Sequence, residues 1–102
     1  MLTIEKIKEA QKRIAPFVYK TPLLRLNNLD EYLGCQVYTK MESFQKTNSF
    51  KVRGAVNKLM TLSEEELNKG IITVSSGNHG KAVAYAATLL GRKARVVIPD
   101  NA

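Results

Sequence analysis

Apolar residues recur at helical spacing in the first part of the chain. Four of them lie three or four positions apart, as on one face of an α-helix: Ile4, Ile7, Ala10 and Ile14. Thr3 stands before this repeat, where its side-chain oxygen can cap a helix, and Pro16 stops the repeat. The pattern predicts a helix over residues 4–14 that packs through one face.

The segment that follows predicts short elements separated by turns. Leu23 to Leu26 favours an extended conformation, and residues 28–33 favour a short helix that ends at Gly34. Apolar and polar residues then alternate over residues 37–42, as in a strand whose two faces differ. We expect these elements to serve as scaffold.

A longer helix is predicted after a polar turn at residues 45–48. Ser49 is the expected N-cap, and the helix runs from Phe50 to about Met60. Gly54 lies inside this helix and lowers its stability. We therefore expect another backbone to approach Gly54 closely.

The last part of the chain predicts a strand, a helix and a second strand. Ser63 and Glu66 form a capping box for a short preceding helix. Residues 71–74 are uncharged and mostly β-branched, which is typical of a strand buried on both faces of a parallel sheet. Residues 80–90 favour a helix closed by Gly91, and residues 94–98 favour the next strand. This order predicts an α/β fold: an open parallel sheet with flanking helices in three layers.

Charge and cysteine content narrow the function classes. The chain of 102 residues has 16 Lys and Arg against 9 Asp and Glu, but its basic residues are scattered and often stand beside acids. We therefore predict no nucleic-acid partner. No apolar run spans a bilayer and no secretory signal pattern begins the chain, so we expect no membrane association. Cys35 has no second cysteine for a disulfide or a zinc pattern, which favours the reducing cytoplasm.

Two groups of reactive side chains stand at predicted helix starts. Lys51 directly follows the aromatic Phe50, which places an amine beside apolar surface and favours its nucleophilic form. The second group is the loop at residues 75–80, with the sequence S-S-G-N-H-G. Free backbone N–H groups at helix starts bind anions, so a carboxylate or a phosphate suits this loop. Ligands of open parallel sheets bind beyond the carboxyl ends of the strands, where both groups are expected.

Each of these residues also has a purely structural interpretation. An exposed lysine on a helix is ordinarily a solvated charge, and Phe50 fits ordinary core packing. Ser75, Ser76 and Asn78 are common helix-capping residues. His79 is the only histidine and has no acidic or cysteine partner at a metal-ligand or triad spacing. We therefore expect no metal site and no Ser-His-Asp mechanism.

The two motifs together resemble a known enzyme family. The chain carries S-F-K-x-R-G-A at residues 49–55 and S-S-G-N-H-G at residues 75–80. The segments K-T-P-L at residues 20–23 and E-S-F-Q-K-T at residues 42–47 also fit. In these motifs the chain is similar to the pyridoxal-phosphate (PLP) enzymes of the tryptophan-synthase-β fold, or fold type II. The threonine/serine dehydratases and serine racemases are the members that it resembles most.

The resemblance implies a role for each motif residue. Lys51 forms a Schiff base with PLP and then acts as the base at the substrate α-carbon. Phe50 lies against the cofactor ring, and Asn78 hydrogen-bonds the 3′-oxygen of the cofactor. Four loop residues are implied to hold the substrate carboxylate: Ser75, Ser76, Gly77 and His79. In racemases of the family one loop serine is a second acid/base, and Ser76 is the candidate by position.

The resemblance also implies an activity and a layout. The activity is that of threonine dehydratase, which converts L-threonine to 2-oxobutanoate and ammonia, in a cytoplasmic homo-oligomer of amino-acid metabolism such as isoleucine biosynthesis. Residues 1–42 would belong to the large domain and residues 43–102 to an incomplete small domain. Such enzymes are roughly three times as long, so we expect an N-terminal part that is inactive alone.

Two alternatives stay open beside the dehydratase. A serine racemase or another β-eliminating PLP enzyme carries the same motifs. A non-catalytic truncated chain that acts only through self-association is the other alternative, because an unfinished sheet edge favours pairing with another chain.

Overall fold

The computed structural model describes residues 1–102 and has the expected α/β composition. The α-helices are α1 (Ile4–Ile14), α2 (Asn27–Leu33), α3 (Lys51–Met60), α4 (Glu64–Asn68) and α5 (Asn78–Leu89). The strands are β1 (Leu23–Arg25), β2 (Tyr38–Lys40), β3 (Ile71–Val74) and β4 (Ala94–Val97). Two short 3₁₀ turns, η1 (Glu42–Phe44) and η2 (Lys46–Asn48), connect β2 to α3.

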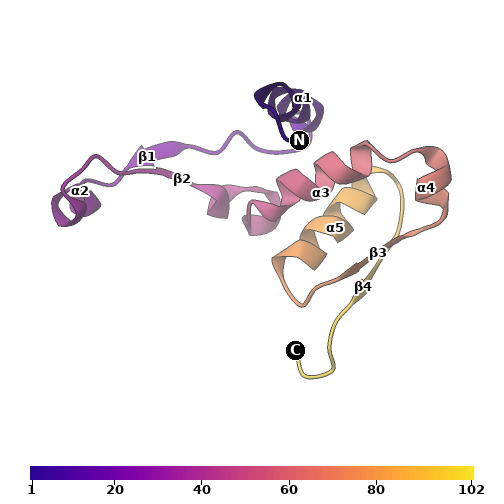
Figure 1. The fold of residues 1–102 in the computed structure, drawn as a ribbon. Coiled ribbons are helices and arrows are strands. Elements are labelled where there is room, and N and C mark those ends of the chain that lie inside the picture. Colours follow the sequence, from indigo (N-terminus) through magenta and orange to yellow (C-terminus); the bar gives the residue numbers. More distant parts are fainter.

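The strands form two separate pairs. β3 and β4 are parallel, with Ile71 opposite Ala94 and Val74 opposite Val97, and α5 makes the crossover between them. β1 and β2 are antiparallel and, together with α2, form an arm that extends away from the helices in Figure 1. The parallel pair confirms the predicted strand–helix–strand unit.

The core lies between α3 and α5, which run side by side above the parallel pair in Figure 1. Val52 and Val56 of α3 are fully buried. Small residues of α5 allow the two helices to approach closely, and they are also buried: Ala82, Ala86 and Ala87. Ile14 at the end of α1 joins the same cluster, so the first helix is attached to α3.

The parallel pair is buried on one face only, so the prediction of a strand buried on both faces is wrong for these residues. Ile71 and Thr73 turn toward the helices, whereas Ile72 and Val74 remain 65% and 73% exposed. The same alternation occurs in β4, where Val97 is 42% exposed. The uncharged pattern indicated burial on both faces, but no second layer of this chain covers the outer face.

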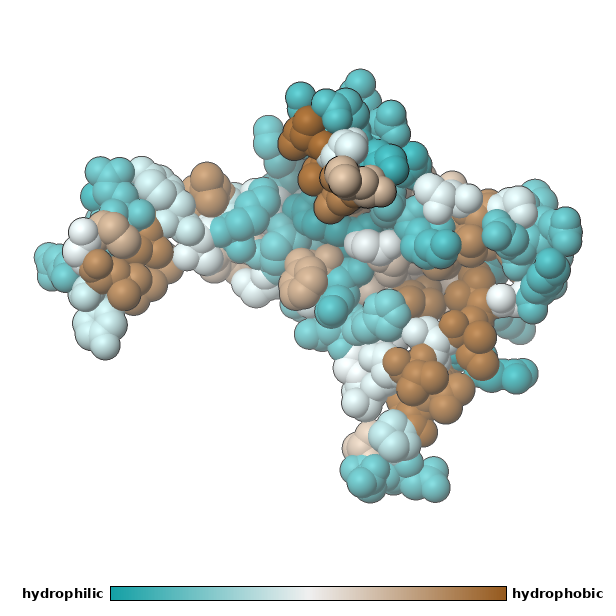
Figure 2. Space-filling model, viewed as in Figure 1, coloured by the Kyte–Doolittle hydropathy of each residue, from teal (hydrophilic) through white to brown (hydrophobic).

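The chain is more open than a complete domain of its length. Its radius of gyration is 16.6 Å, compared with about 13 Å for a compact domain of about 100 residues. Figure 2 shows apolar residues gathered at the outer end of the arm and below the helices, around β3 and β4. No helix combines the length and the apolar character that a bilayer crossing requires.

Most predicted helix ends are confirmed. The Thr3 hydroxyl accepts a hydrogen bond from the Lys6 backbone N–H at 3.3 Å, and the Ser63 capping box is present. Gly34, Gly70 and Gly91 all adopt positive φ at the ends of helices or in the turns that follow.

Candidate active site

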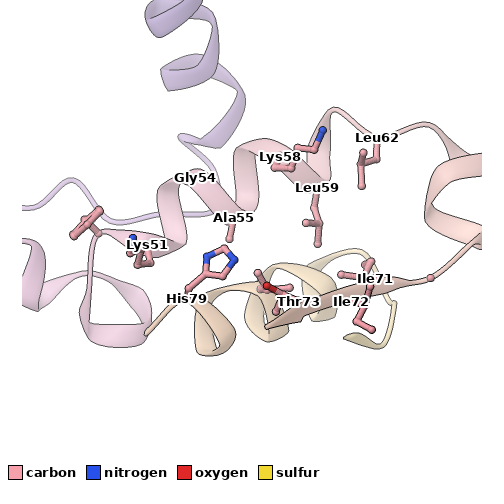
Figure 3. Close-up of a pocket in the computed structure, with 13 residues that line it drawn as sticks. Lys51, Gly54, Ala55, Lys58, Leu59, Leu62, Ile71, Ile72, Thr73 and His79 are labelled. Atoms are coloured by element: carbon pink, nitrogen blue, oxygen red, sulfur yellow. The ribbon is translucent and has the colours of Figure 1, made fainter. Parts of the chain in front are cut away.

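A pocket of about 550 Å³ lies between α3, β3 and the start of α5. Residues of α3 line one side of it, and β3 and α5 supply the other sides (Figure 3). The α3 residues are spaced along one helical face and include Lys51, Ala55 and Lys58. His79, the second residue of α5, extends its ring toward Ala55 in Figure 3. The pocket therefore brings Lys51 and the only histidine to one concave surface.

Lys51 occupies the first position of α3, as the sequence indicated. Its Nζ atom lies 5.0 Å from the centroid of the Phe50 ring. Phe50 remains 59% exposed and also lines the pocket, so it is not an ordinary core residue. An exposed amine therefore stands beside an exposed aromatic ring in the lining of the pocket.

The loop at residues 75–80 joins β3 to the start of α5. The Ser75 hydroxyl accepts a hydrogen bond from the Gly77 N–H at 3.2 Å, which shapes the turn. Ser75 is half-buried, while Ser76, Gly77 and Asn78 are exposed. No side chain caps α5, so the structural interpretation of these residues as helix caps is not supported. The first N–H groups of α5 are free to bind an anion, and the loop hydroxyl and amide groups stand next to them.

Close packing explains why residue 80 is a glycine, but it does not explain the glycine at residue 54. A Cβ atom at Gly80 would lie 2.8 Å from Val96 Cγ1 and 3.2 Å from the Ser75 carbonyl oxygen. A Cβ atom at Gly54 would meet nothing within 4 Å, so the predicted close approach there is wrong. Gly80 thus allows the start of α5 to pack on β4 directly behind the loop.

The start of α3 also differs from the prediction. Phe50, and not Ser49, is the N-cap residue, and no side chain caps the helix. Ser49 is buried, and its Oγ atom has no hydrogen-bond partner. Before it, Thr47 and Asn48 both adopt the left-handed conformation, with φ of 63° and 59°. A tight turn and not a capped entry therefore leads into Lys51.

The sequence did not reveal the role of Glu42 behind this turn. The Glu42 carboxylate accepts hydrogen bonds from Arg53 Nε at 2.8 Å, from Arg53 Nη2 at 2.7 Å and from the Thr21 hydroxyl at 2.5 Å. The hydrogen bond from Arg53 is the main cause that lowers the pKa of Glu42 to about 2, while burial opposes the lowering. The three residues are distant in sequence, so spacing alone could not have identified the cluster.

No three His, Cys, Asp or Glu side chains are grouped so as to hold a metal ion. The polar side chains that line the pocket are the amines of Lys51 and Lys58, the hydroxyl of Thr73 and the imidazole of His79, whereas Ser75, Ser76, Gly77 and Asn78 lie outside its lining.

Comparison with known proteins yields one family. The sequence profile described as "Pyridoxal-phosphate dependent enzyme" matches residues 14–102. A serine racemase of Dictyostelium discoideum is 48% identical over 101 residues, which are 99% of this chain and 31% of that protein. An L-threonine ammonia-lyase of Thermotoga maritima is also 48% identical, over 102 residues that are 25% of its length.

Solved structures agree with these relatives. The crystal structure of the Dictyostelium discoideum serine racemase matches with a TM-score of 0.92 and 48% identity, over 99% of this chain and 33% of that chain. The crystal structure of the T.th. threonine deaminase matches with a TM-score of 0.88 and 46% identity, over 99% of this chain and 32% of that chain. The chain thus spans a quarter to a third of the length of these relatives.

Proposed function

The chain belongs to the family of pyridoxal-phosphate-dependent enzymes of fold type II, and we propose that it supplies the cofactor lysine and the substrate-carboxylate loop of an ammonia-lyase. The proposed reaction converts L-threonine to 2-oxobutanoate and ammonia. One observation carries this proposal: Lys51 and His79 line a single pocket that lies beside the uncapped start of α5.

The residues of the pocket suit pyridoxal phosphate. Its volume of about 550 Å³ lies in the ordinary range for small-molecule sites, about 300–1,000 Å³. Lys51 is the proposed residue that would bond to the cofactor aldehyde, and Phe50 would lie against the ring. Asn78, the first residue of α5, would donate a hydrogen bond to the 3′-oxygen from beside the pocket. When bound, the cofactor stores the electron pair that is left at the substrate α-carbon.

The protein residues orient the substrate and move its proton. Ser75, Ser76, Gly77 and His79 are proposed to hold the substrate carboxylate, with support from the free N–H groups of α5. The amine of Lys51 removes the α-proton once it is free of the cofactor. Elimination then expels the β-hydroxyl, which takes up a proton and leaves as water, and the released aminocrotonate hydrolyses to 2-oxobutanoate and ammonia. The α-carbon loses a proton from one side only, so no second base on the opposite side is needed.

Racemisation of serine is the alternative, because relatives with that name are as similar as the ammonia-lyases. It requires a second group that returns a proton on the opposite side of the α-carbon. Ser76 is the proposed group, because its exposed position in the loop leaves its hydroxyl accessible. The cytoplasm is the proposed location of either enzyme, since the single cysteine forms no disulfide.

A chimeric enzyme tests the proposal. This chain would replace the matching 102 residues of the Thermotoga maritima L-threonine ammonia-lyase, and 2-oxobutanoate release from threonine and D-serine formation from L-serine would be measured. Lys51→Ala should abolish turnover. Lys58→Ala is the matched control, because Lys58 lies on the same helical face and in the same pocket. Turnover that survives Lys51→Ala would refute the proposed role of Lys51.

Self-association is the second candidate function, because β3 and β4 leave one apolar face exposed. Ile72, Val74 and Val97 lie on this outer face, and each is at least 42% exposed. Arg95, opposite Ile72, is exposed on the same face, and Ile72 also borders the candidate pocket. Sedimentation velocity on the purified chain distinguishes a monomer from a defined oligomer. A monomer at all concentrations would contradict this candidate.

A further inference from the structure

We propose that Glu42 is a positioning residue for Lys51: its carboxylate fixes the rotation of the first turn of α3 and thereby the direction in which Lys51 points. The inference rests on the proposed role of Lys51 and adds to it a residue outside the pocket.

Glu42 binds Arg53 through two hydrogen bonds. Arg53 Nε donates to one carboxylate oxygen at 2.8 Å, and Arg53 Nη2 donates to the other at 2.7 Å. The Glu42 and Arg53 side chains are 18% and 32% exposed, so the pair is partly shielded from water. A paired contact of this kind fixes the orientation of the guanidinium group as well as its distance.

Arg53 and Lys51 project from opposite sides of α3. Successive helix residues are rotated by about 100° about the axis, so Arg53 lies about 200° away from Lys51. The grooves that the two residues line agree with this rotation. Lys51 lines the candidate pocket, whereas Arg53 and Asn57 line a groove that faces α1. The contact of Arg53 with Glu42 holds one side of the first turn, and it therefore also sets the direction of Lys51 on the opposite side.

Other polar contacts at the start of α3 are few. No side chain caps the helix, and the Ser49 hydroxyl has no partner. Thr47 and Asn48 precede it in left-handed conformations that non-glycine residues seldom adopt. Val52 is fully buried and anchors the helix in the core. Removing the Glu42 carboxylate should therefore affect only the first turn, which would rotate or fray locally.

The other end of the contact is firmly held. Thr21 is 4% exposed, and its hydroxyl donates to Glu42 at 2.5 Å. Gln45 anchors the same segment, because its side-chain amide exchanges two hydrogen bonds of 2.8 Å with the backbone of Tyr19. Glu42 therefore connects α3 to a fixed segment of the chain.

The test compares the full chain with the variants Glu42→Ala, Glu42→Gln and Arg53→Lys. Glu64→Ala is the matched control, because it removes another Arg–Glu pair, with Arg92, at α4. Each protein is incubated with pyridoxal phosphate, reduced with borohydride and mapped by mass spectrometry. The ratio of label on Lys51 to label on Lys58 is one readout. Amide hydrogen exchange at residues 53–56, compared with α5, is the other.

Glu42→Ala should lower the labelling ratio roughly fivefold, and it should accelerate exchange at residues 53–56 roughly tenfold more than exchange in α5. Glu42→Gln and Arg53→Lys should give smaller changes in the same direction, and Glu64→Ala should give none. Wild-type values in Glu42→Ala would overturn the inference. Equal acceleration in α5 would also overturn it, because it would indicate a general loss of stability.

The two proposals fail in different ways. If wild-type Lys51 is labelled no more than Lys58, the proposed function of Lys51 is wrong, and amide exchange alone still decides whether Glu42 fixes the first turn. If wild-type labelling favours Lys51 and Glu42→Ala does not change it, only the positioning role is wrong.

Discussion

Replacing Glu42 by Gln should make the chain less stable at neutral pH and remove part of its acid sensitivity. Glu42 contributes stability as a carboxylate because Arg53 lowers its pKa from 4.5 to about 2. A group with a lowered pKa stabilises the folded state above its unfolded pKa, and this contribution is lost as the pH falls from about 4.5 to about 2.

The size of the effect follows from the same pKa. At about 1.4 kcal/mol per pKa unit, the lowering corresponds to at most roughly 3 kcal/mol. Arg53 keeps 32% of its side chain in water, and screening by this water reduces the contribution to about 2 kcal/mol. Glutamine has the shape of a protonated glutamate, so wild type and Glu42→Gln should converge in acid.

Urea unfolding of both proteins between pH 7 and pH 2 measures this difference. The difference in free energy of unfolding should be about 2 kcal/mol at neutral pH and should approach zero near pH 2. Glu65→Gln is the control, because Glu65 is 83% exposed in its pair with Lys69 and should contribute little at any pH. A difference between wild type and Glu42→Gln that does not depend on pH would refute the reasoning.

Three further substitutions test other parts of the structure. Thr47→Gly should raise the free energy of unfolding by about 1 kcal/mol, because Thr47 has a φ of 63° and a buried hydroxyl without a partner. A lower free energy of unfolding in urea would contradict this. Gly80→Leu should lower the free energy of unfolding by about 3 kcal/mol, because the new side chain meets Val96 and the Ser75 carbonyl. An unchanged midpoint of thermal unfolding would contradict this prediction. Val74→Lys should reduce self-association in sedimentation velocity, since Val74 is 73% exposed on the outer apolar face; unchanged association would exclude that face.

Two control substitutions separate these site-specific effects from the general effect of adding a side chain to a glycine or a charge to the surface. Gly54→Ala should raise stability by up to about 1 kcal/mol, because a Cβ atom at this helical position meets nothing within 4 Å. Ser43→Lys adds the same charge as Val74→Lys at a position on the turn before α3, away from the outer apolar face, and it should leave association unchanged.

Local chemistry made much of the secondary structure predictable. Thr3 and Ser63 cap helices because their hydroxyls need only a backbone N–H three residues away. Gly34 ends α2 in a left-handed conformation that other residues adopt at a cost. The motifs at residues 49–55 and 75–80 similarly indicated the family, because they carry specific residue types at fixed spacing.

The wrong predictions concern contacts between distant parts of the chain. Ser49 precedes a helix, but its hydroxyl is buried and makes no hydrogen bond to the N–H groups that it would cap. The tight approach lies at Gly80 because α5 packs on Val96, a neighbour that the local sequence does not reveal. The contact of Glu42 with Thr21 and Arg53 spans 21 residues in one direction and 11 in the other. Such partners become visible only in the folded chain.

The most direct test of the account is the position of the lysine that reacts with pyridoxal phosphate. The purified chain would be mixed with the cofactor, reduced with borohydride, digested and mapped by mass spectrometry. The account predicts that Lys51 carries more label than any other lysine, including Lys58 in the same pocket. Label spread evenly over the lysines, with Lys51 no higher than Lys58, would contradict it.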